Sequence, residues 1–298
     1  MSVRNSRKVL LLITLLSALT LAACGGSGSS SETLYIGGIP DQDLALMEEN
    51  FGLLADYLTD ETGINVEYNA AADYAAIVTS FSLGDVPLVW FGGLTGIQAR
   101  LATPGANAIV QRPLDADFYT VYITQPGSGI ETLEDVRGKR LTFGSESSTS
   151  GHVMPRSFLL EAGIDPDTDL DGPPNYSGSH DTTIRLVETG AFEVGGVNEA
   201  IWEDRVERGE VDTDAVQVFH RAGPSYNYHW VVRPDIDDQF GAGTAQALEE
   251  ALLNMHEDTE DERVEQVLAF FTTDRFIPTE NGNYDSLEAT ARSIGLIE

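Results

Sequence analysis

The feature that most constrains the fold is an alternation of short apolar runs with longer amphipathic segments along most of the chain. Runs such as "TLYIGGI", "INVEY", "PLVWF" and "AIVQ" have the length and composition of buried strands. The segments 44–58, 74–83 and 95–101 lie between them and carry apolar residues at helical spacing, and Gly63 marks a helix end. This pattern predicts an α/β protein, with about three βα units before residue 118.

The length of the chain indicates two lobes. About 270 residues follow the N-terminal segment, which is more than one hydrophobic core usually holds. The long apolar run 118–124, "FYTVYIT", is expected to cross into a second lobe, and 228–234, "YHWVVRP", to lead back. We therefore predict that lobe I contains residues 33–118 and 223–298, and that lobe II contains residues 119–222.

The remaining patterns fill these two lobes. In lobe II we expect a strand at 141–143, a helix after Ser179, the strand "FEVGGV" and a helix from Asn198 to Arg208. In lobe I, further segments are typical of bracing helices, near Thr244 to Met255, Glu262 to Phe270 and Tyr284 to Ile294.

The N-terminus has the pattern of an export signal. Arg4, Arg7 and Lys8 precede the uncharged run 9–23, which resembles the apolar core of a secretory signal and is short for a membrane span. We therefore predict that residues 1–23 form a signal peptide and not a transmembrane helix.

The signal ends in "LAAC", and Cys24 is the only cysteine, so no intramolecular disulfide can form. This end resembles the lipobox of bacterial lipoproteins, which implies that Cys24 becomes the lipidated first residue of the mature chain; a buried free cysteine is the alternative. Residues 24–32, "CGGSGSSSE", then form a flexible tether. We expect an extracytoplasmic protein that is anchored to a membrane through this lipid.

The chain is strongly acidic. Removal of residues 1–23 deletes three positive charges and no negative charge, so the net charge changes from −31 to −34. Such a surface repels nucleic acid and anionic lipid headgroups, which excludes both as partners. The charge is typical either of a salt-rich habitat or of an acidic exported protein. Any anionic ligand must therefore be held by local hydrogen-bond donors.

The richest donor cluster is the loop "SESSTSG", which follows strand 141–143 and precedes an apolar-faced helix. Pro155 is tolerated only in the first turn of that helix, so regular helix is expected from about His152. The N–H groups of Ser148 to Gly151 are then free to bind an anion, and Gly151 allows close approach of the backbone. Ordinary helix capping is the alternative, but it requires only one hydroxyl.

Several pieces of the sequence carry a family resemblance. "STSG" followed by proline, "DYAA", "VWFGG", "GSHD" and "RFIP" resemble the phosphate, phosphite and phosphonate-binding proteins of ABC importers, from Thr33 to Glu298. "FGGLTGIQARL", "FGSESSTSGHVMP" and "YHWVVRPD" are most similar to a branch labelled selenate-binding. The resemblance implies a type II periplasmic-binding-protein fold, in which two α/β lobes joined by two crossing strands close around one oxyanion in the cleft.

The resemblance also implies a set of ligand-binding residues. The oxyanion cradle falls on Ser148, Thr149 and Ser150, beside Gly151. The resemblance also implies contacts from the Tyr74 hydroxyl and the His180 imidazole. Thr95 is a candidate to replace a lost donor, and Asn198 is a candidate for an additional contact from the opposite lobe. Phe91 stands where the family often has tyrosine, which removes a phenolic donor. Tyr74 and Trp90 could equally be core aromatics, and His180 could be a plain helix cap.

Other classes of function are less well supported. A serine hydrolase would use Ser148, His180 and Asp181, but no nucleophile elbow surrounds the serine, and adjacent helical residues point about 100° apart. A metal-binding lipoprotein would need histidines at ligand spacing, which this chain lacks. A sensory binding module would keep the same fold and site, so it remains an alternative.

We therefore expect a monomeric solute-binding lipoprotein, not an enzyme and without a cofactor, that delivers phosphonate, phosphite or phosphate to an ABC permease and its ATPase. The alternative ligand is selenate or sulfate. Asp181 and Glu199 adjoin expected contact residues, and an inward carboxylate would favour a protonated phosphorus oxyanion, whereas outward carboxylates would permit selenate.

Overall fold

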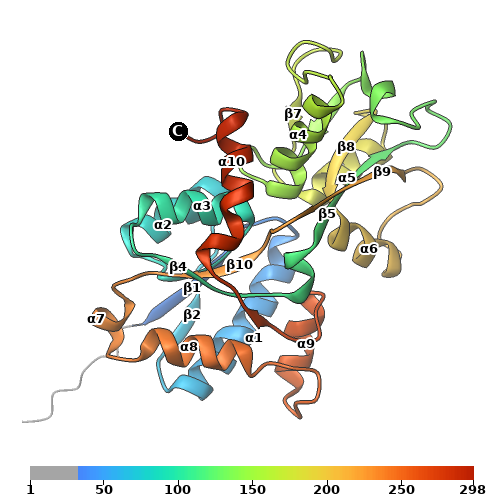
Figure 1. The fold of residues 1–298 in the computed structure, drawn as a ribbon. Helices are drawn as coiled ribbons and strands as arrows, with labels where there is room; N and C mark the ends of the chain where they lie inside the picture. Colours follow the sequence, from blue (N-terminus) through green and yellow to red (C-terminus); the bar gives the residue numbers. More distant parts are fainter. Residues whose placement is uncertain (1–32) are drawn as a thin grey trace, which may run out of the picture. The chain divides into compact units, whose positions relative to one another are not determined.

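The computed structural model describes residues 33–298, which form one compact unit. The predicted signal peptide, the tether and Cys24 lie outside the described residues. Two sheets organise the described chain, and each is covered by helices (Figure 1). The two sheets define a first and a second lobe.

The first lobe contains a six-stranded sheet in the order β11-β4-β10-β3-β1-β2. Neighbouring strands β2, β1 and β3 are parallel, whereas β10 is antiparallel to both β3 and β4. The strands are β1 (Leu34–Gly38), β2 (Val66–Tyr68), β3 (Leu88–Phe91), β4 (Asn107–Gln111), β10 (His229–Val232) and β11 (Ile277–Pro278).

Helices cover both faces of this sheet: Figure 1 shows α2 and α3 on one side and α1, α8 and α9 on the other. The α-helices are α1 (Leu44–Thr62), α2 (Tyr74–Leu83), α3 (Gly93–Ala102), α7 (Ile236–Phe240), α8 (Thr244–Leu253), α9 (Glu262–Phe270) and α10 (Asp285–Ser293). Short 3₁₀ turns are η1 (Pro113–Ala116) and η4 (Asn281–Tyr284).

Both ends of α1 are capped. The Asp43 side chain accepts hydrogen bonds from the backbone N–H groups of Ala45 and Leu46, which satisfies donors that a helix start otherwise leaves free. Gly63 ends the helix with φ +72°, a left-handed conformation that glycine adopts without strain. The α3 helix begins at Gly93, two residues earlier than the sequence predicts, because Gly92 offers no side chain that would mark the cap.

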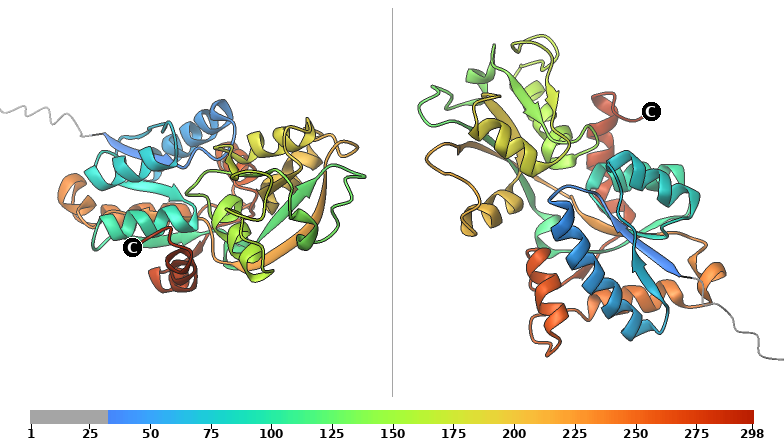
Figure 2. Two further views of the ribbon diagram at one scale, coloured as in Figure 1. Left: turned by 90° about the horizontal axis from the view of Figure 1, so that it is seen from above. Right: turned by 180° about the vertical axis from the view of Figure 1, so that it is seen from behind.

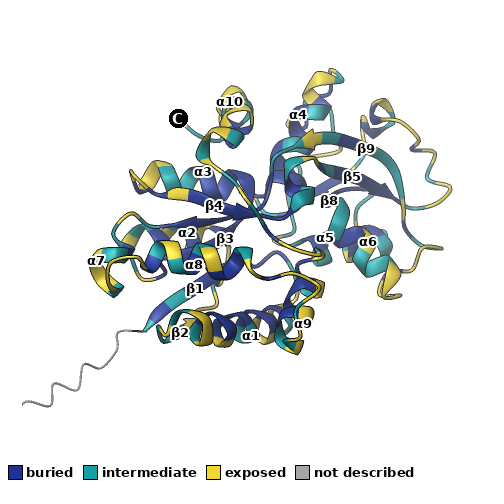
Figure 3. Cartoon of the chain, turned by 60° about the horizontal axis from the view of Figure 1, so that its bottom comes forward, coloured by how far each residue is buried: buried dark blue, intermediate teal, exposed yellow. Residues whose placement is uncertain are grey.

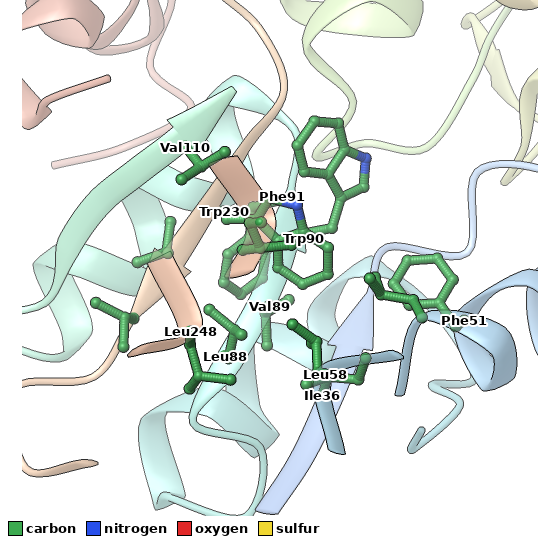
Figure 4. Packing of buried hydrophobic residues seen from close by; sticks show 14 of the residues in the cluster. Ile36, Phe51, Leu58, Leu88, Val89, Trp90, Phe91, Val110, Trp230 and Leu248 are labelled. Carbon is green, nitrogen blue, oxygen red and sulfur yellow. The ribbon is translucent and has the colours of Figure 1, made fainter. Parts of the chain in front are cut away.

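The core of the first lobe is aromatic. Trp230 is fully buried on β10, Trp90 is 4% exposed on β3, and their rings are 5.6 Å apart. Figure 4 shows these two rings among the aliphatic side chains of the neighbouring strands. This buried core fixes the carboxyl ends of β1 and β3, and polar loops follow both strands.

The second lobe contains a five-stranded sheet in the order β7-β6-β8-β5-β9. Its strands are β5 (Phe118–Thr124), β6 (Leu141–Phe143), β7 (Asn175–Tyr176), β8 (Val194–Asn198) and β9 (Gln217–Ser225). Its helices are α4 (Met154–Glu161), α5 (His180–Glu188) and α6 (Glu199–Glu207), with the short turns η2 (Leu133–Val136) and η3 (Thr149–Val153). The strand β9 has no counterpart among the sequence predictions, because its residues are largely half-exposed and not an apolar run.

Two strands connect the lobes. The chain enters the second lobe through β5 and returns through β9 into β10, and β5 and β9 pair antiparallel from Phe118 opposite Ser225 onwards. Figure 2 shows the connection from above and from behind. Because both connections are adjacent hydrogen-bonded strands, they form a natural hinge for relative motion of the lobes.

The strands contain many of the buried residues. Figure 3 shows buried residues concentrated in the strands and exposed residues on the outer sides of helices such as α1 and α8. Within residues 33–298, no helix is both long enough and apolar enough to cross a membrane.

Candidate functional site

The hydroxyl-rich loop lies between β6 and α4, and Ser148, Thr149 and Ser150 are each at most 3% exposed. The Ser148 hydroxyl accepts the backbone N–H of Gly151 at 3.0 Å, and the Ser148 N–H donates to the carbonyl of Ser145 at 2.9 Å. Two of the four N–H groups predicted to be free are therefore used inside the loop. The N–H groups of Thr149 and Ser150 have no hydrogen-bond partner within residues 33–298.

The helix after this loop starts later than predicted. Regular α-helix begins at Met154 and not near His152, because a wider π-helical turn precedes it. In this turn the Val153 N–H donates to the Ser148 carbonyl and the Met154 N–H to the Thr149 carbonyl. Pro155 has no N–H that could donate to a carbonyl of a tighter turn, which is consistent with the wide turn before it. Thr149, at the start of this turn, contacts the other lobe.

Gly151 is required by close packing. A Cβ atom at this position would lie 2.8 Å from the Ser148 hydroxyl, 3.0 Å from Cε1 of His180 and 3.2 Å from Cα of Gly144. Any side chain would therefore push the loop away from His180. The glycine brings the hydroxyl loop and the first residue of α5 together.

His180 presents a hydrogen-bond donor. Its Nδ1 accepts the backbone N–H of Asn198 at 3.3 Å, so in the neutral ring the proton is on Nε2. Burial lowers the pKa of His180 to about 3, which keeps the ring neutral at physiological pH. The Nε2 atom is buried and has no protein partner among the described residues.

Two further buried hydroxyls lack partners. The Tyr74 hydroxyl lies beside the Ser148 side chain but does not reach hydrogen-bond geometry, and Tyr74 is 3% exposed. The Ser150 hydroxyl is also buried and unpartnered within residues 33–298. Burying a polar group without a partner costs about 1–3 kcal/mol, so three such donors around one loop indicate a place for an acceptor-rich ligand.

The first lobe contacts this loop through the start of α3. The backbone N–H of Leu94 donates to the Thr149 hydroxyl oxygen at 2.8 Å, and the backbone N–H of Gly93 donates to Oδ1 of Asn227 at 3.1 Å. Thr149 thus accepts a hydrogen bond from the opposite lobe, and its own hydroxyl hydrogen remains available.

Three sequence candidates have other contacts. The Thr95 hydroxyl donates to the Gly92 carbonyl at 3.0 Å, inside the first turn of α3. The Phe91 ring is fully buried and packs edge-on against Phe81 with centroids 5.5 Å apart. Asn198 caps α6, because its Oδ1 accepts the Ile201 N–H at 3.1 Å.

Sequence reasoning missed Asp41 and Tyr228. The Tyr228 hydroxyl donates to Oδ2 of Asp41 at 2.7 Å and accepts from Nδ2 of Asn198 at 3.0 Å. The Asp41 carbonyl accepts the backbone N–H of His180 at 3.2 Å. Burial raises the pKa of Asp41 to about 6, and the Tyr228 hydrogen bond offsets part of this rise. The position of Asp41 in the sequence could have indicated it, since Asp41 follows the carboxyl end of β1, where ligands bind in α/β sheets.

A buried ion pair packs next to Tyr228. Arg112 and Asp115 form two hydrogen bonds of 2.7 and 2.9 Å, and the Arg112 guanidinium lies 5.0 Å from the Tyr228 ring centroid. The Tyr228 ring also stacks on Trp90 with centroids 5.6 Å apart. The Tyr228 ring is therefore held by packing against both Trp90 and Arg112, which also lie close to each other.

The two carboxylates that sequence analysis considered are engaged elsewhere. Asp181 is paired with Arg205 at 3.0 Å, and Glu199 is paired with Arg221. Asp41 is instead the carboxylate that hydrogen-bonds within the buried network around His180. Over residues 33–298, no group of three or more His, Cys, Asp or Glu is placed to hold a metal ion.

Comparisons with known proteins agree with this arrangement. The family model for the ABC transporter, phosphonate, periplasmic substrate-binding protein matches residues 36–284. The probable ABC transporter phosphite binding protein PhnD1 of Prochlorococcus marinus is 36% identical over 275 residues, which cover 90% of this chain and 92% of that protein. The phosphate-import protein PhnD of Mycolicibacterium smegmatis is 27% identical over 60% of this chain and 61% of its own.

Solved structures match over a similar range. The structure of PhnD1 from Prochlorococcus marinus in complex with methylphosphonate has a TM-score of 0.86 and 34% identity, and covers 90% of this chain and 100% of its own. These matches confirm the predicted type II binding-protein fold and the expectation that the protein is not an enzyme. The chain belongs to the phosphonate family of periplasmic substrate-binding proteins of ABC transporters, which act outside the cytoplasm with a permease and an ATPase.

Proposed function

We propose that this protein is a lipid-anchored receptor that captures a small phosphorus oxyanion, namely a phosphonate, phosphite or phosphate, and presents it to the permease. The observation that carries the proposal is the set of buried unpartnered donors on Tyr74, Ser150 and His180 around one loop. A tetrahedral oxyanion offers several acceptor oxygens at once, which matches this set.

The proposed contacts come from both lobes. Tyr74 belongs to the first lobe, and Ser148, Thr149, Ser150 and His180 belong to the second. A ligand that accepts from both sides would stabilise the closed arrangement over an open one. Gly151 allows the loop to pack close to His180, and we propose that it acts on the ligand indirectly, by positioning these neighbours.

The donors proposed to face the ligand are neutral, because they are hydroxyl groups and the neutral ring of His180. The buried Arg112 is paired with Asp115. Neutral donors in a buried site can bind an anion despite the strongly acidic chain, since hydrogen bonds to a charged acceptor are worth about 1.5–3 kcal/mol each. The acidic surface acts mainly on the association rate, which salt screens.

Calorimetric titration of the tag-free mature protein tests the ligand. We expect binding of methylphosphonate, phosphite or phosphate and much weaker binding of sulfate and selenate. Tight binding of selenate without measurable binding of any phosphorus anion would contradict the proposed ligand and would leave the fold unaffected. Binding is expected to be the same with and without a metal chelator.

Membrane anchoring through Cys24 has a separate test. Cys24→Ser removes the thiol that would carry the lipid, so we expect the exported protein to move from the membrane fraction to the soluble fraction. The affinity for the ligand should not change, because Cys24 precedes the folded unit that starts at Thr33. Retention of the variant in the membrane fraction would contradict the lipoprotein assignment.

A further inference from the structure

Asp41 occupies an unusual position for a carboxylate in an anion receptor. Its side chain follows β1 in the first lobe and is 5% exposed, and its backbone carbonyl accepts the N–H of His180 from the second lobe. Tyr74, whose hydroxyl is unpartnered, is close enough for the Asp41 charge to raise its pKa. The Asp41 backbone therefore contacts the start of α5, and its carboxylate lies near Tyr74, one of the donors proposed to hold the ligand.

The hydrogen bonds around Asp41 have a fixed direction. The Asn198 amide Nδ2 can only donate, so the Tyr228 hydroxyl accepts from it and donates its own hydrogen to Oδ2 of Asp41. Asp41 is consequently an acceptor in this chain of hydrogen bonds. Its other oxygen, Oδ1, receives no hydrogen bond from another residue within residues 33–298.

The charges around Asp41 do not neutralise it fully. The titratable and charged groups that face it come from several elements: Tyr228, Arg112, Asp181, Tyr74 and Tyr68. Arg112 attracts the carboxylate but is paired with Asp115, and Asp181 repels it although it is itself paired with Arg205. Burial raises the pKa of Asp41 to about 6, so at neutral pH the group is mostly an anion, and no other described residue donates to its Oδ1.

We propose that Asp41 selects a ligand that carries a proton, by accepting a hydrogen bond from the P–OH group of a singly protonated phosphorus oxyanion. This inference rests on the proposed function and specifies how the site distinguishes anions. Sulfate and selenate carry no proton at neutral pH, so they would place an oxygen lone pair against the carboxylate. No covalent bond changes, and the proton stays shared between the ligand and Asp41.

The first test is the substitution Asp41→Asn, which keeps the size of the side chain and replaces an acceptor by an amide donor. We expect the dissociation constant for methylphosphonate to rise at least tenfold and sulfate or selenate binding to become stronger. Asp181→Asn is the matched control, because it removes an equal charge near Asp41 from a carboxylate that is paired with Arg205, and we expect it to leave both affinities within about twofold.

The second test uses the wild-type protein alone and measures the number of protons taken up when the ligand binds. At about pH 9 free methylphosphonate is mainly a dianion and Asp41 is ionised, so formation of a singly protonated complex must take up about one proton per ligand. Calorimetry in two buffers of different ionisation enthalpy measures this number. The affinity should also fall about tenfold per pH unit in this range.

The outcomes separate the two claims. If the wild type binds no phosphorus anion, the proposed function fails. If the wild type binds methylphosphonate but Asp41→Asn binds it equally well, or if no proton is taken up at about pH 9, the role of Asp41 is wrong and the proposed function stands. Loss of methylphosphonate binding in a folded Asp41→Asn variant, together with proton uptake by the wild type, supports the inference.

Discussion

Arg112→Met is expected to lower the free energy of unfolding by about 3–5 kcal/mol, because it leaves a buried carboxylate without its cation. Asp115 is fully buried, and Arg112 is 6% exposed. Arg112 also donates to the carbonyl of Phe271 at 2.7 Å and lies over the rings of Trp90 and Tyr228. Urea denaturation of wild type and variant measures the loss.

Two control variants show whether the loss comes from the orphaned charge. Adding Asp115→Asn to Arg112→Met removes that charge and should recover part of the stability, because an asparagine oxygen can still accept the Tyr228 N–H now held at 3.1 Å. Arg221→Met breaks an ion pair whose arginine side chain is 51% exposed, and should change stability by less than about 1 kcal/mol. Equal effects of Arg112→Met and Arg221→Met would contradict this account.

The fold could be predicted largely from local patterns. The helix α1 could be predicted because its apolar residues recur at helical spacing and Gly63 marks its end, and β3 because a run of apolar residues suits a strand buried on both faces. The strand β9 could not be predicted, since its pairing with β5 depends on partners about 100 residues away and not on its own composition.

The site could be predicted only in part. The hydroxyl cluster around Ser148 stood out in the sequence, whereas His180 was indicated as a contact only by the family resemblance. Whether such a residue faces the cleft depends on tertiary contacts: Thr95 donates to its own turn and Phe91 turns into the core. Asp41 did not stand out among 48 acidic residues, because only the fold reveals its burial.

Thr149 is expected to contribute to ligand affinity through two interactions. Its hydroxyl oxygen accepts the Leu94 N–H from the first lobe, and its hydrogen is free for a ligand oxygen. The residue therefore couples ligand binding to the contact between the lobes. A ligand that accepts from Thr149 polarises the hydroxyl and strengthens the hydrogen bond from Leu94, because hydrogen bonds in a chain reinforce one another.

Thr149→Val keeps the shape of the side chain but removes both interactions, and it leaves the buried Leu94 N–H without a partner. We expect the affinity for methylphosphonate to fall by about 1.5–3 kcal/mol, which corresponds to roughly 10- to 150-fold in the dissociation constant. Calorimetric titration measures this change, and Thr149→Ser should retain most of the affinity because it keeps the hydroxyl.

A matched control separates this effect from a general loss of stability. Thr124→Val also removes a buried threonine hydroxyl in the second lobe, which donates to the Glu193 carbonyl at 2.8 Å. Thr124 ends β5, and neither of its hydroxyl partners belongs to the hydroxyl loop, so this variant should lose stability without losing affinity. If Thr149→Val bound methylphosphonate as tightly as the wild type, the hydroxyl loop would not hold the ligand through Thr149. If Thr124→Val weakened binding equally, the loss would reflect destabilisation of the second lobe and not a specific contact, because a direct ligand contact can be lost only at Thr149.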